Sequence, residues 1–172
     1  MKEKELYSGP IFKLITKDVM IKDKAYRRDI IRHAGGVGIL VIQDHKILLV
    51  RQMRHAIDQT TLEIPAGKLE YGEDPKSAGL RELNEETGLD CKELKLVQSI
   101  VSTPGFCDER IWIYEAIDCV QAEHKLSMDE DEEIETIWMP LKEAYQKLCA
   151  NAIQDAKTVV AILHACMKEG IR

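Results

Sequence analysis

The sequence predicts an α+β fold, in which a mixed β-sheet packs against helices. Two patterns indicate it. Apolar stretches of strand length run through the chain between residues 11 and 139, several joined by short polar turns typical of hairpins. Stretches with helical periodicity lie after some of these strands, and two of them close the chain. Its 172 residues suit one domain with a sizeable core.

The strongest hairpin joins residues 36–43 to residues 47–52 through the polar turn Asp44-His45-Lys46. A Pro-Ala-Gly turn follows the strand predicted at 61–64. Helices are expected at 141–149 and 155–168. The remaining predicted strands cover residues 11–14, 18–21, 94–102, 110–117 and 134–139. The first thirty-odd residues, 1–34, are expected to form a small β segment of their own, set apart from residues 35–172.

Composition excludes several classes of protein. A net charge of −6 argues against a nucleic-acid partner, because binding duplex phosphates requires a basic surface. Five scattered cysteines, with no Cys-x-x-Cys pair, favour reduced thiols in the cytoplasm. The charged start lacks the apolar run of a signal peptide. No stretch reaches the ~20 apolar residues that span a bilayer, so no membrane is expected.

A third helix is predicted between residues 74 and 88. Asp74 suits the N-cap, and Pro75 suits the first helical position, where its missing N–H costs nothing. Gly88 can take the left-handed conformation that ends a helix. Leu80 and Leu83 are expected to enter the core.

Three carboxylates, Glu82, Glu85 and Glu86, fall on one face of this helix. They repel one another, and Arg81 can offset part of that repulsion. A hard, oxygen-seeking cation such as Mg²⁺ or Mn²⁺ would neutralise them far better. Taken alone, such a triplet is more often a solvated acidic face than a metal site, so it does not by itself establish one.

The surroundings of the triplet form a longer motif. It reads Gly, five residues, Glu, seven residues, Arg-Glu-aliphatic, one residue, Glu-Glu, one residue, Gly-aliphatic. The chain fills all nine fixed positions: Gly67, Glu73, Arg81, Glu82, Leu83, Glu85, Glu86, Gly88 and Leu89. With this motif the chain resembles the Nudix hydrolases.

The resemblance implies an α/β/α sandwich whose mixed sheet lies between helices. It also implies that Mg²⁺, with Mn²⁺ as a possible substitute, is bound by Glu82, Glu85, Glu86 and the backbone carbonyl of Ala66. Glu85 is counted among the catalytic residues as well. The residues expected to hold the loop and helix in place are Gly67, Glu73, Arg81 and Gly88. A cluster of divalent ions would neutralise a diphosphate and align the attacking water.

Features outside the motif resemble the ADP-ribose pyrophosphatase branch of the family. Pro104 lies fifteen residues beyond Leu89, a spacing typical of that branch. Residues 50–54 and 62–67 resemble its entry to the motif. Residues 129–135 resemble its acidic catalytic loop, and residues 153–158 resemble its closing helix.

That branch implies a homodimer in which the N-terminal segment crosses to the partner's cleft. Tyr7 and Phe12 could then stack on adenine, although they could equally anchor the N-terminal sheet. Arg28 and Arg54 are expected to contact substrate, because a guanidinium grips phosphate as a fork and stacks on bases. Glu109 could hold the terminal ribose, or be an ordinary loop carboxylate.

A catalytic base is expected in the acidic loop, since the helix carboxylates are committed to metal. Glu132 is the first candidate and Glu130 the second.

The expected function is Mg²⁺-dependent hydrolysis of ADP-ribose to AMP and ribose 5-phosphate. One alternative is a Nudix pyrophosphatase for another nucleotide sugar or dinucleotide. From a different class, the chain could be a non-catalytic ADP-ribose sensor, but such sensors usually carry a degraded motif or a fused DNA-binding domain.

Overall fold

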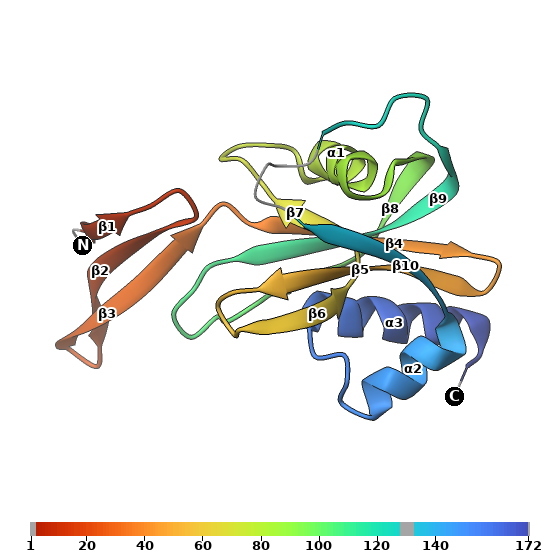
Figure 1. Ribbon diagram of the computed structural model, residues 1–172. Helices are drawn as coiled ribbons and strands as arrows, with labels where there is room; N and C mark the ends of the chain where they lie inside the picture. Colours follow the sequence, from red (N-terminus) through yellow and green to blue (C-terminus); the bar gives the residue numbers. More distant parts are fainter. Residues whose placement is uncertain (1–2, 128–132, 172) are drawn as a thin grey trace.

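A computed structural model of the protein describes residues 3–127 and 133–171. In it, a mixed sheet lies between helix α1 (Pro75–Thr87) on one face and helices α2 (Leu141–Cys149) and α3 (Ala156–Glu169) on the other (Figure 1). A separate three-stranded sheet extends from one end of this sandwich. The predicted α+β class and the α/β/α sandwich are confirmed.

The central sheet has seven strands, and β4 and β9 are its one parallel pair within the described residues. Five strands follow in the order β10 (Ile134–Pro140), β5 (Lys46–Arg54), β4 (Gly36–Gln43), β9 (Arg110–Gln121) and β8 (Leu89–Val101). Two short strands lie off this path: β6 (Gln59–Glu63) pairs with β5, and β7 (Ala66–Lys68) pairs with β4.

The sheet divides between β4 and β5, and this division positions the site. These strands pair only next to their turn, at Ile42–Ile47 and Gln43–Lys46. Farther along, β5 pairs with β6 and β4 pairs with β7. The connection from β6 to β7 therefore lies where the two halves of the sheet diverge. The Pro-Ala-Gly turn predicted here is only partly present, because Ala66 and Gly67 belong to strand β7 and pair with β4.

Two apolar clusters, one on each face of the sheet, form the core. Along β4, Val37, Ile39 and Val41 pack with α1, whereas Leu40 packs with α2 and α3. This alternation is the period-2 pattern of a strand buried on both faces. Leu83 of α1 is fully buried, as expected.

Leu80 does not enter the core, contrary to the sequence prediction, because it lies on the outer side of α1 and stays exposed.

The predicted hairpin turn is present. Asp44 and His45 both have positive φ (49° and 59°), the backbone of a two-residue turn that matches strand twist.

The N-terminal sheet was only partly predicted. It consists of β1 (Glu3–Ser8), β2 (Phe12–Ile21) and β3 (Lys24–His33), all antiparallel. The strands predicted at 11–14 and 18–21 are parts of the single strand β2. Most of this sheet is exposed, so its sequence lacks a clean alternation of apolar and polar residues. Its second turn uses Lys22 and Asp23 at positive φ, and neither is a glycine that would mark a turn.

The helices match their predicted ranges closely. Residues 141–149 form α2 as expected, and α3 begins one residue after its N-cap, Asp155. None of the helices within the described residues is long and apolar enough to span a bilayer.

Candidate active site

The ends of α1 fix where its side chains point. Asp74 caps the N-terminus, where its Oδ2 accepts the Ser77 N–H at 2.9 Å. At the other end Gly88 has φ 70°, and its N–H donates to the Asn84 carbonyl at 2.8 Å. Inside the helix, a Cβ on Gly79 would lie 2.9 Å from Leu94 Cδ1 and 3.3 Å from Val37 Cγ2, so the glycine helps α1 to pack close to the sheet.

The three carboxylates predicted for α1 do share one region, and each has a defined neighbour. Arg81 Nη1 donates to Glu82 Oε1 at 2.8 Å and to Glu85 Oε2 at 2.9 Å. Glu86 Oε2 accepts the N–H of Ala66 at 3.0 Å. Burial alone would lower the pKa of Arg81, but the two carboxylates outweigh it and raise that pKa above its usual value. Arg81 therefore stays charged between them.

The loop before α1 lies directly against this face. A Cβ on Gly67 would lie 1.9 Å from Cδ and Oε1 of Glu82, so the backbone at Gly67 and this carboxylate occupy adjoining space. Glu73 Oε2 accepts the N–H of Glu70 at 2.9 Å, and Glu73 Oε1 lies 3.4 Å from Arg81 Nη2. Gly67, Glu73 and Arg81 thus lie together where this segment meets the helix.

The donors on this face suit a hard divalent cation. They are carboxylate oxygens, to which the resemblance adds the Ala66 carbonyl. Within residues 3–127 and 133–171, no group of three His, Cys, Asp or Glu side chains stands arranged as a metal-binding cluster. Instead Glu82 and Glu85 turn toward Arg81, a cation already on the same face.

Two cavities open beside the Gly67 loop. The smaller cavity, about 550 Å³, contains Arg81, Glu82 and Glu85. The larger cavity, about 850 Å³, is lined by polar side chains from five segments of the chain: His33, Arg54, Glu109, Glu133 and Lys157. Both cavities are lined by Ile11, His33, Gly67 and Lys68. The carboxylate face and the larger cavity are therefore neighbours, and the loop at Gly67 separates them.

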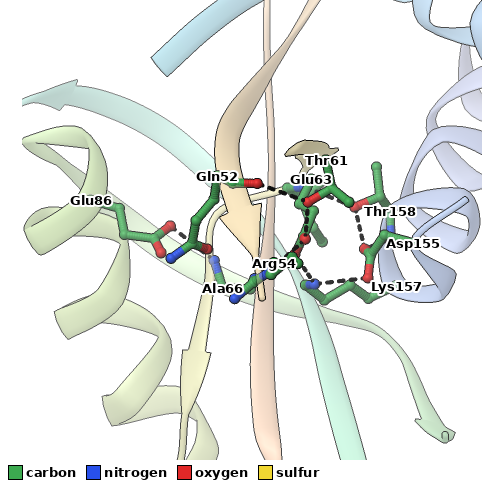
Figure 2. Close-up of polar contacts among 10 residues, drawn as sticks. Gln52, Arg54, Thr61, Glu63, Ala66, Glu86, Asp155, Lys157 and Thr158 are labelled. Carbon is green, nitrogen blue, oxygen red and sulfur yellow. Dashed lines mark hydrogen bonds and ion pairs between the residues drawn. The ribbon is translucent and has the colours of Figure 1, made fainter. Parts of the chain in front are cut away.

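A buried ionic network forms one wall of the larger cavity (Figure 2). Glu63, at the end of β6, accepts two hydrogen bonds from Arg54, with Nε at 2.7 Å and Nη2 at 2.6 Å. It also accepts the Thr61 hydroxyl at 2.6 Å and Lys157 Nζ at 2.5 Å. Lys157 donates further to Asp155 at 3.0 Å.

Glu63 is ionised because of this network. Burial by itself would raise its pKa, since Glu63 is 2% exposed. The hydrogen bonds from Arg54 and the charge of Lys157 outweigh burial and lower the pKa to about 2. The same hydrogen bonds raise the pKa of Arg54.

The loop that carries Pro104 and Glu109 is fastened to the end of β3. The backbone of Ile31 exchanges hydrogen bonds with it, donating to the Phe106 carbonyl at 2.7 Å and accepting the Asp108 N–H at 3.1 Å. Asp108 accepts a further hydrogen bond from the His33 N–H at 2.9 Å. This attachment brings Glu109 to the larger cavity, whereas Pro104 lies in the exposed part of the loop and lines neither cavity.

His33 lies where the two cavities meet. Its Nδ1 accepts the Gly35 N–H at 3.0 Å, so the neutral ring carries its proton on Nε2. Glu109 Oε1 lies 3.6 Å from the same Nδ1.

The N-terminal candidates lie apart from the carboxylate face of the same chain. Tyr7 and Phe12 pack together, with ring centroids 5.6 Å apart. Arg28 lies over the Tyr26 ring at 5.8 Å. None of the predicted contacts Tyr7, Phe12 and Arg28 lines either cavity of its own chain.

The two base candidates, Glu132 and Glu130, lie outside the described residues. Their neighbour Glu133, just before β10, lines the larger cavity.

Sequence reasoning missed three residues at these cavities: His33, Glu63 and Lys157. No histidine spacing singled out His33. Glu63 and Lys157 both stand in segments that resemble the pyrophosphatase branch, but they are 94 residues apart, and no sequence pattern pairs them.

Comparison with known proteins agrees with the motif. The model of the NUDIX domain matches residues 32–161. A methanol dehydrogenase activator of Bacillus methanolicus is 38% identical, over 100% of this chain and 94% of its own length. An ADP-ribose pyrophosphatase of Bacillus subtilis is 37% identical, over 99% of this chain and 93% of its own.

A solved structure described as an ADP compounds hydrolase superposes with a TM-score of 0.82. It covers 100% of this chain and 95% of its own at 21% identity, and so supports the fold alone. The matched domain takes in the β6–β7 connection, α1 and the first turn of α3, which together carry the carboxylate face and the ionic network. The chain belongs to the Nudix family.

Proposed function

We propose that the chain hydrolyses the diphosphate of ADP-ribose, with Mg²⁺, to AMP and ribose 5-phosphate. The observation that carries the proposal is the meeting of two surfaces at Gly67. One is the carboxylate face of α1, and the other is the larger cavity with Arg54 on its wall. Relatives named ADP-ribose pyrophosphatase support the choice of substrate, including one of Mycobacterium tuberculosis at 29% identity over 92% of this chain.

Mg²⁺, or Mn²⁺ in its place, would be held by Glu82, Glu85, Glu86 and the Ala66 carbonyl. The bound metal supplies charge neutralisation on the diphosphate and lowers the pKa of a bound water. The fit rests on the all-oxygen donor set and on the close approach of Gly67 to Glu82.

The chain's own residues orient the substrate. Arg54 donates to Glu63 through Nε and Nη2, and its Nη1 donates to no described residue. Nη1 can therefore donate to a phosphate oxygen at the cavity wall. Glu109 lines the same cavity and can accept hydrogen bonds from the terminal ribose. In the proposed complex the diphosphate would lie between the arginine and the carboxylate face.

A loop carboxylate is proposed to accept the proton of the attacking water, with Glu132 first and Glu130 second. Support comes from Glu133, the next residue along the chain, which lines the larger cavity. Glu132→Gln should lower kcat strongly and leave KM nearly unchanged. If the loss follows Glu130→Gln instead, the base is Glu130; if neither change costs more than a few-fold, the loop has another purpose.

We further propose that residues 1–34 act as a dimerisation and substrate-binding segment attached to a Nudix domain at 35–172. The sheet formed there exposes Leu6, Tyr7, Met20, Ile21 and Tyr26. Exposed apolar side chains on a projecting sheet suit burial against a second copy of the chain. In such a homodimer Tyr7, Phe12 and Arg28 would serve the partner's cavity. The cytoplasm is the compartment that suits five free cysteines.

Product analysis on a substrate panel tests the proposed function. The panel includes ADP-ribose, ADP-glucose, NADH, FAD and the nucleoside triphosphates, each with Mg²⁺ and with EDTA. The proposal expects AMP and ribose 5-phosphate from ADP-ribose, only with metal, at the highest kcat/KM of the panel. A higher kcat/KM for another nucleotide sugar or dinucleotide would select that substrate instead, and binding of ADP-ribose without cleavage would make the chain a sensor.

A second candidate is activation of a dehydrogenase, favoured by the full-length similarity to the methanol dehydrogenase activator. It is tested by adding the purified chain to a methanol dehydrogenase assay. A parallel assay with Glu86→Gln shows whether activation requires hydrolysis.

A further inference from the structure

The closing helix α3 carries a charged turn that the proposed chemistry has not used. Lys157 and Thr158, in its first turn, are 8% and 0% exposed. A buried lysine is costly unless it is paired, so its place in the structure calls for an explanation. Both residues reach across to the segment that leads into the Gly67 loop (Figure 2).

Two contacts join this turn to that segment. Lys157 Nζ donates to Glu63 Oε2 at 2.5 Å, and Thr158 Oγ1 accepts the Ile64 N–H at 2.9 Å. Asp155 holds both, since it accepts Lys157 Nζ at 3.0 Å and the Thr158 hydroxyl at 2.6 Å. The first turn of α3 therefore fixes the carboxylate of Glu63 and the backbone N–H of Ile64, shortly before Ala66 in the chain.

Glu63 passes this constraint on to Arg54. Its two oxygens receive Nε and Nη2 of the guanidinium as a fork, which sets the plane of that group. Arg54 remains 39% exposed in its side chain and lines the larger cavity, as does Lys157. A cavity-wall arginine on a flexible stem would otherwise lose considerable side-chain entropy on binding a ligand.

The charges of the network balance only when Lys157 is present. Arg54 and Lys157 oppose Glu63 and Asp155, giving two positive and two negative charges. Without Lys157, Glu63 and Asp155 would share one cation, and Arg54 would be drawn toward both of them and away from the cavity. The cavity wall, which is neutral while Lys157 is present, would then carry a net negative charge and repel phosphate.

We propose that Lys157 is a positioning residue for the substrate diphosphate: through Glu63 it holds the Arg54 guanidinium facing the larger cavity. The inference rests on the proposed function, because it takes the diphosphate as the ligand of Arg54. Helix α3 would thus contribute to substrate affinity as well as packing against the sheet.

A double-mutant cycle tests the proposal, using Lys157→Met, Arg54→Gln and the double variant. Methionine keeps the length of the lysine side chain and removes its charge. Affinity is measured by calorimetry with α,β-methylene ADP-ribose and Mg²⁺, and KM and kcat are measured with ADP-ribose. We expect Arg54→Gln to weaken binding by about 10- to 100-fold and Lys157→Met by about tenfold, each raising KM more than it lowers kcat.

The decisive quantity is the effect of Lys157→Met in the Arg54→Gln background. If Lys157 acts through Arg54, the second change should add less than about twofold, because residues in one network are not additive. A full tenfold further loss in the double variant would overturn the proposal, and so would unchanged affinity in Lys157→Met.

Lys168→Met is the matched control. It removes a lysine from the same helix and breaks an ion pair of 2.6 Å with Glu115, in which Lys168 is exposed and Glu115 is mostly buried. Binding within about twofold of the unaltered chain is expected, because neither residue lines either cavity. An equal loss of affinity in this variant would show that any charge change in α3 suffices, and would also overturn the proposal.

Melting temperatures decide whether Lys157→Met is folded at the assay temperature. If it is not, Glu63→Gln replaces it in the cycle, since it keeps the shape of the side chain and cuts the same link. Additivity with Arg54→Gln would then overturn the proposal. A failure of the unaltered chain to bind the analogue or cleave ADP-ribose would instead overturn the proposed function, and the inference with it.

Discussion

Adding one methyl group at Gly67 should weaken metal binding while the chain still folds. A Cβ there would lie 1.9 Å from Cδ and Oε1 of Glu82 and 2.3 Å from Oε2. To restore a normal contact the carboxylate must withdraw by about 1.5 Å or more, which a side-chain end can do without unfolding the helix. The expected cost in stability is about 1–3 kcal/mol for overpacking. A displacement of this size at a reacting centre typically lowers kcat about 100-fold.

The assay compares Gly67→Ala with Gly105→Ala, where a Cβ would meet no atom within 4 Å. Mn²⁺ affinity is measured by calorimetry, turnover by AMP release and stability by urea unfolding. We expect Gly67→Ala to lose Mn²⁺ affinity and turnover while unfolding cooperatively, and Gly105→Ala to keep both. Wild-type Mn²⁺ affinity and turnover in Gly67→Ala would refute the assignment of Glu82 as a metal ligand at this loop.

Three further outcomes are expected. Glu86→Gln should lower turnover by orders of magnitude while the chain still folds, because it removes charge at constant shape; near-normal AMP release would contradict the metal assignment. Deleting residues 1–30, which spares the contact of Ile31 with the Pro104 loop, should weaken dimerisation and raise KM together, as measured by ultracentrifugation and kinetics; a dimer with unchanged KM would contradict the crossing segment. Glu63 has a folded pKa of about 2, below the usual glutamate value of 4.5, so its contribution to stability is complete above pH 4.5 and is lost as pH falls toward 2. Between pH 7 and pH 2 the free energy of unfolding in urea should therefore fall by about 3 kcal/mol less in Glu63→Gln than in the unaltered chain. An equal fall in both proteins would contradict the ionised network.

Local signals accounted for the parts of the fold that the sequence predicted. The helix from Pro75 to Thr87 was bounded by a capping aspartate, a proline and a left-handed glycine, and each acts within one turn of its own position. The strands of the sandwich are buried on at least one face, so burial imposed a readable apolar pattern on them. The N-terminal sheet is exposed on most of its surface, and its strand boundaries were correspondingly poorly predicted.

In the candidate site, too, the residues that local sequence signals mark were predicted, and those that tertiary packing brings together were not. Glu82, Glu85 and Glu86 were predicted because they lie on one helix within a single continuous motif that resembles the Nudix hydrolases. Glu63 and Lys157 were not, since their pairing depends on how β6 and α3 pack in three dimensions. His33 was missed for a similar reason: its position between the cavities depends on β3 holding the Pro104 loop.

The five residues 63–67 connect the two halves of the site. They run between α3 on one face of the sheet and α1 on the other (Figures 1 and 2). At the first end Lys157 and Thr158 hold a side chain and a backbone N–H of this segment. At the other end Glu86 accepts a backbone N–H and Glu82 lies against the glycine. A shift of either helix must therefore move the same short segment. The role proposed for Lys157 in substrate affinity therefore acts on a segment whose other end lies against the carboxylate face of α1.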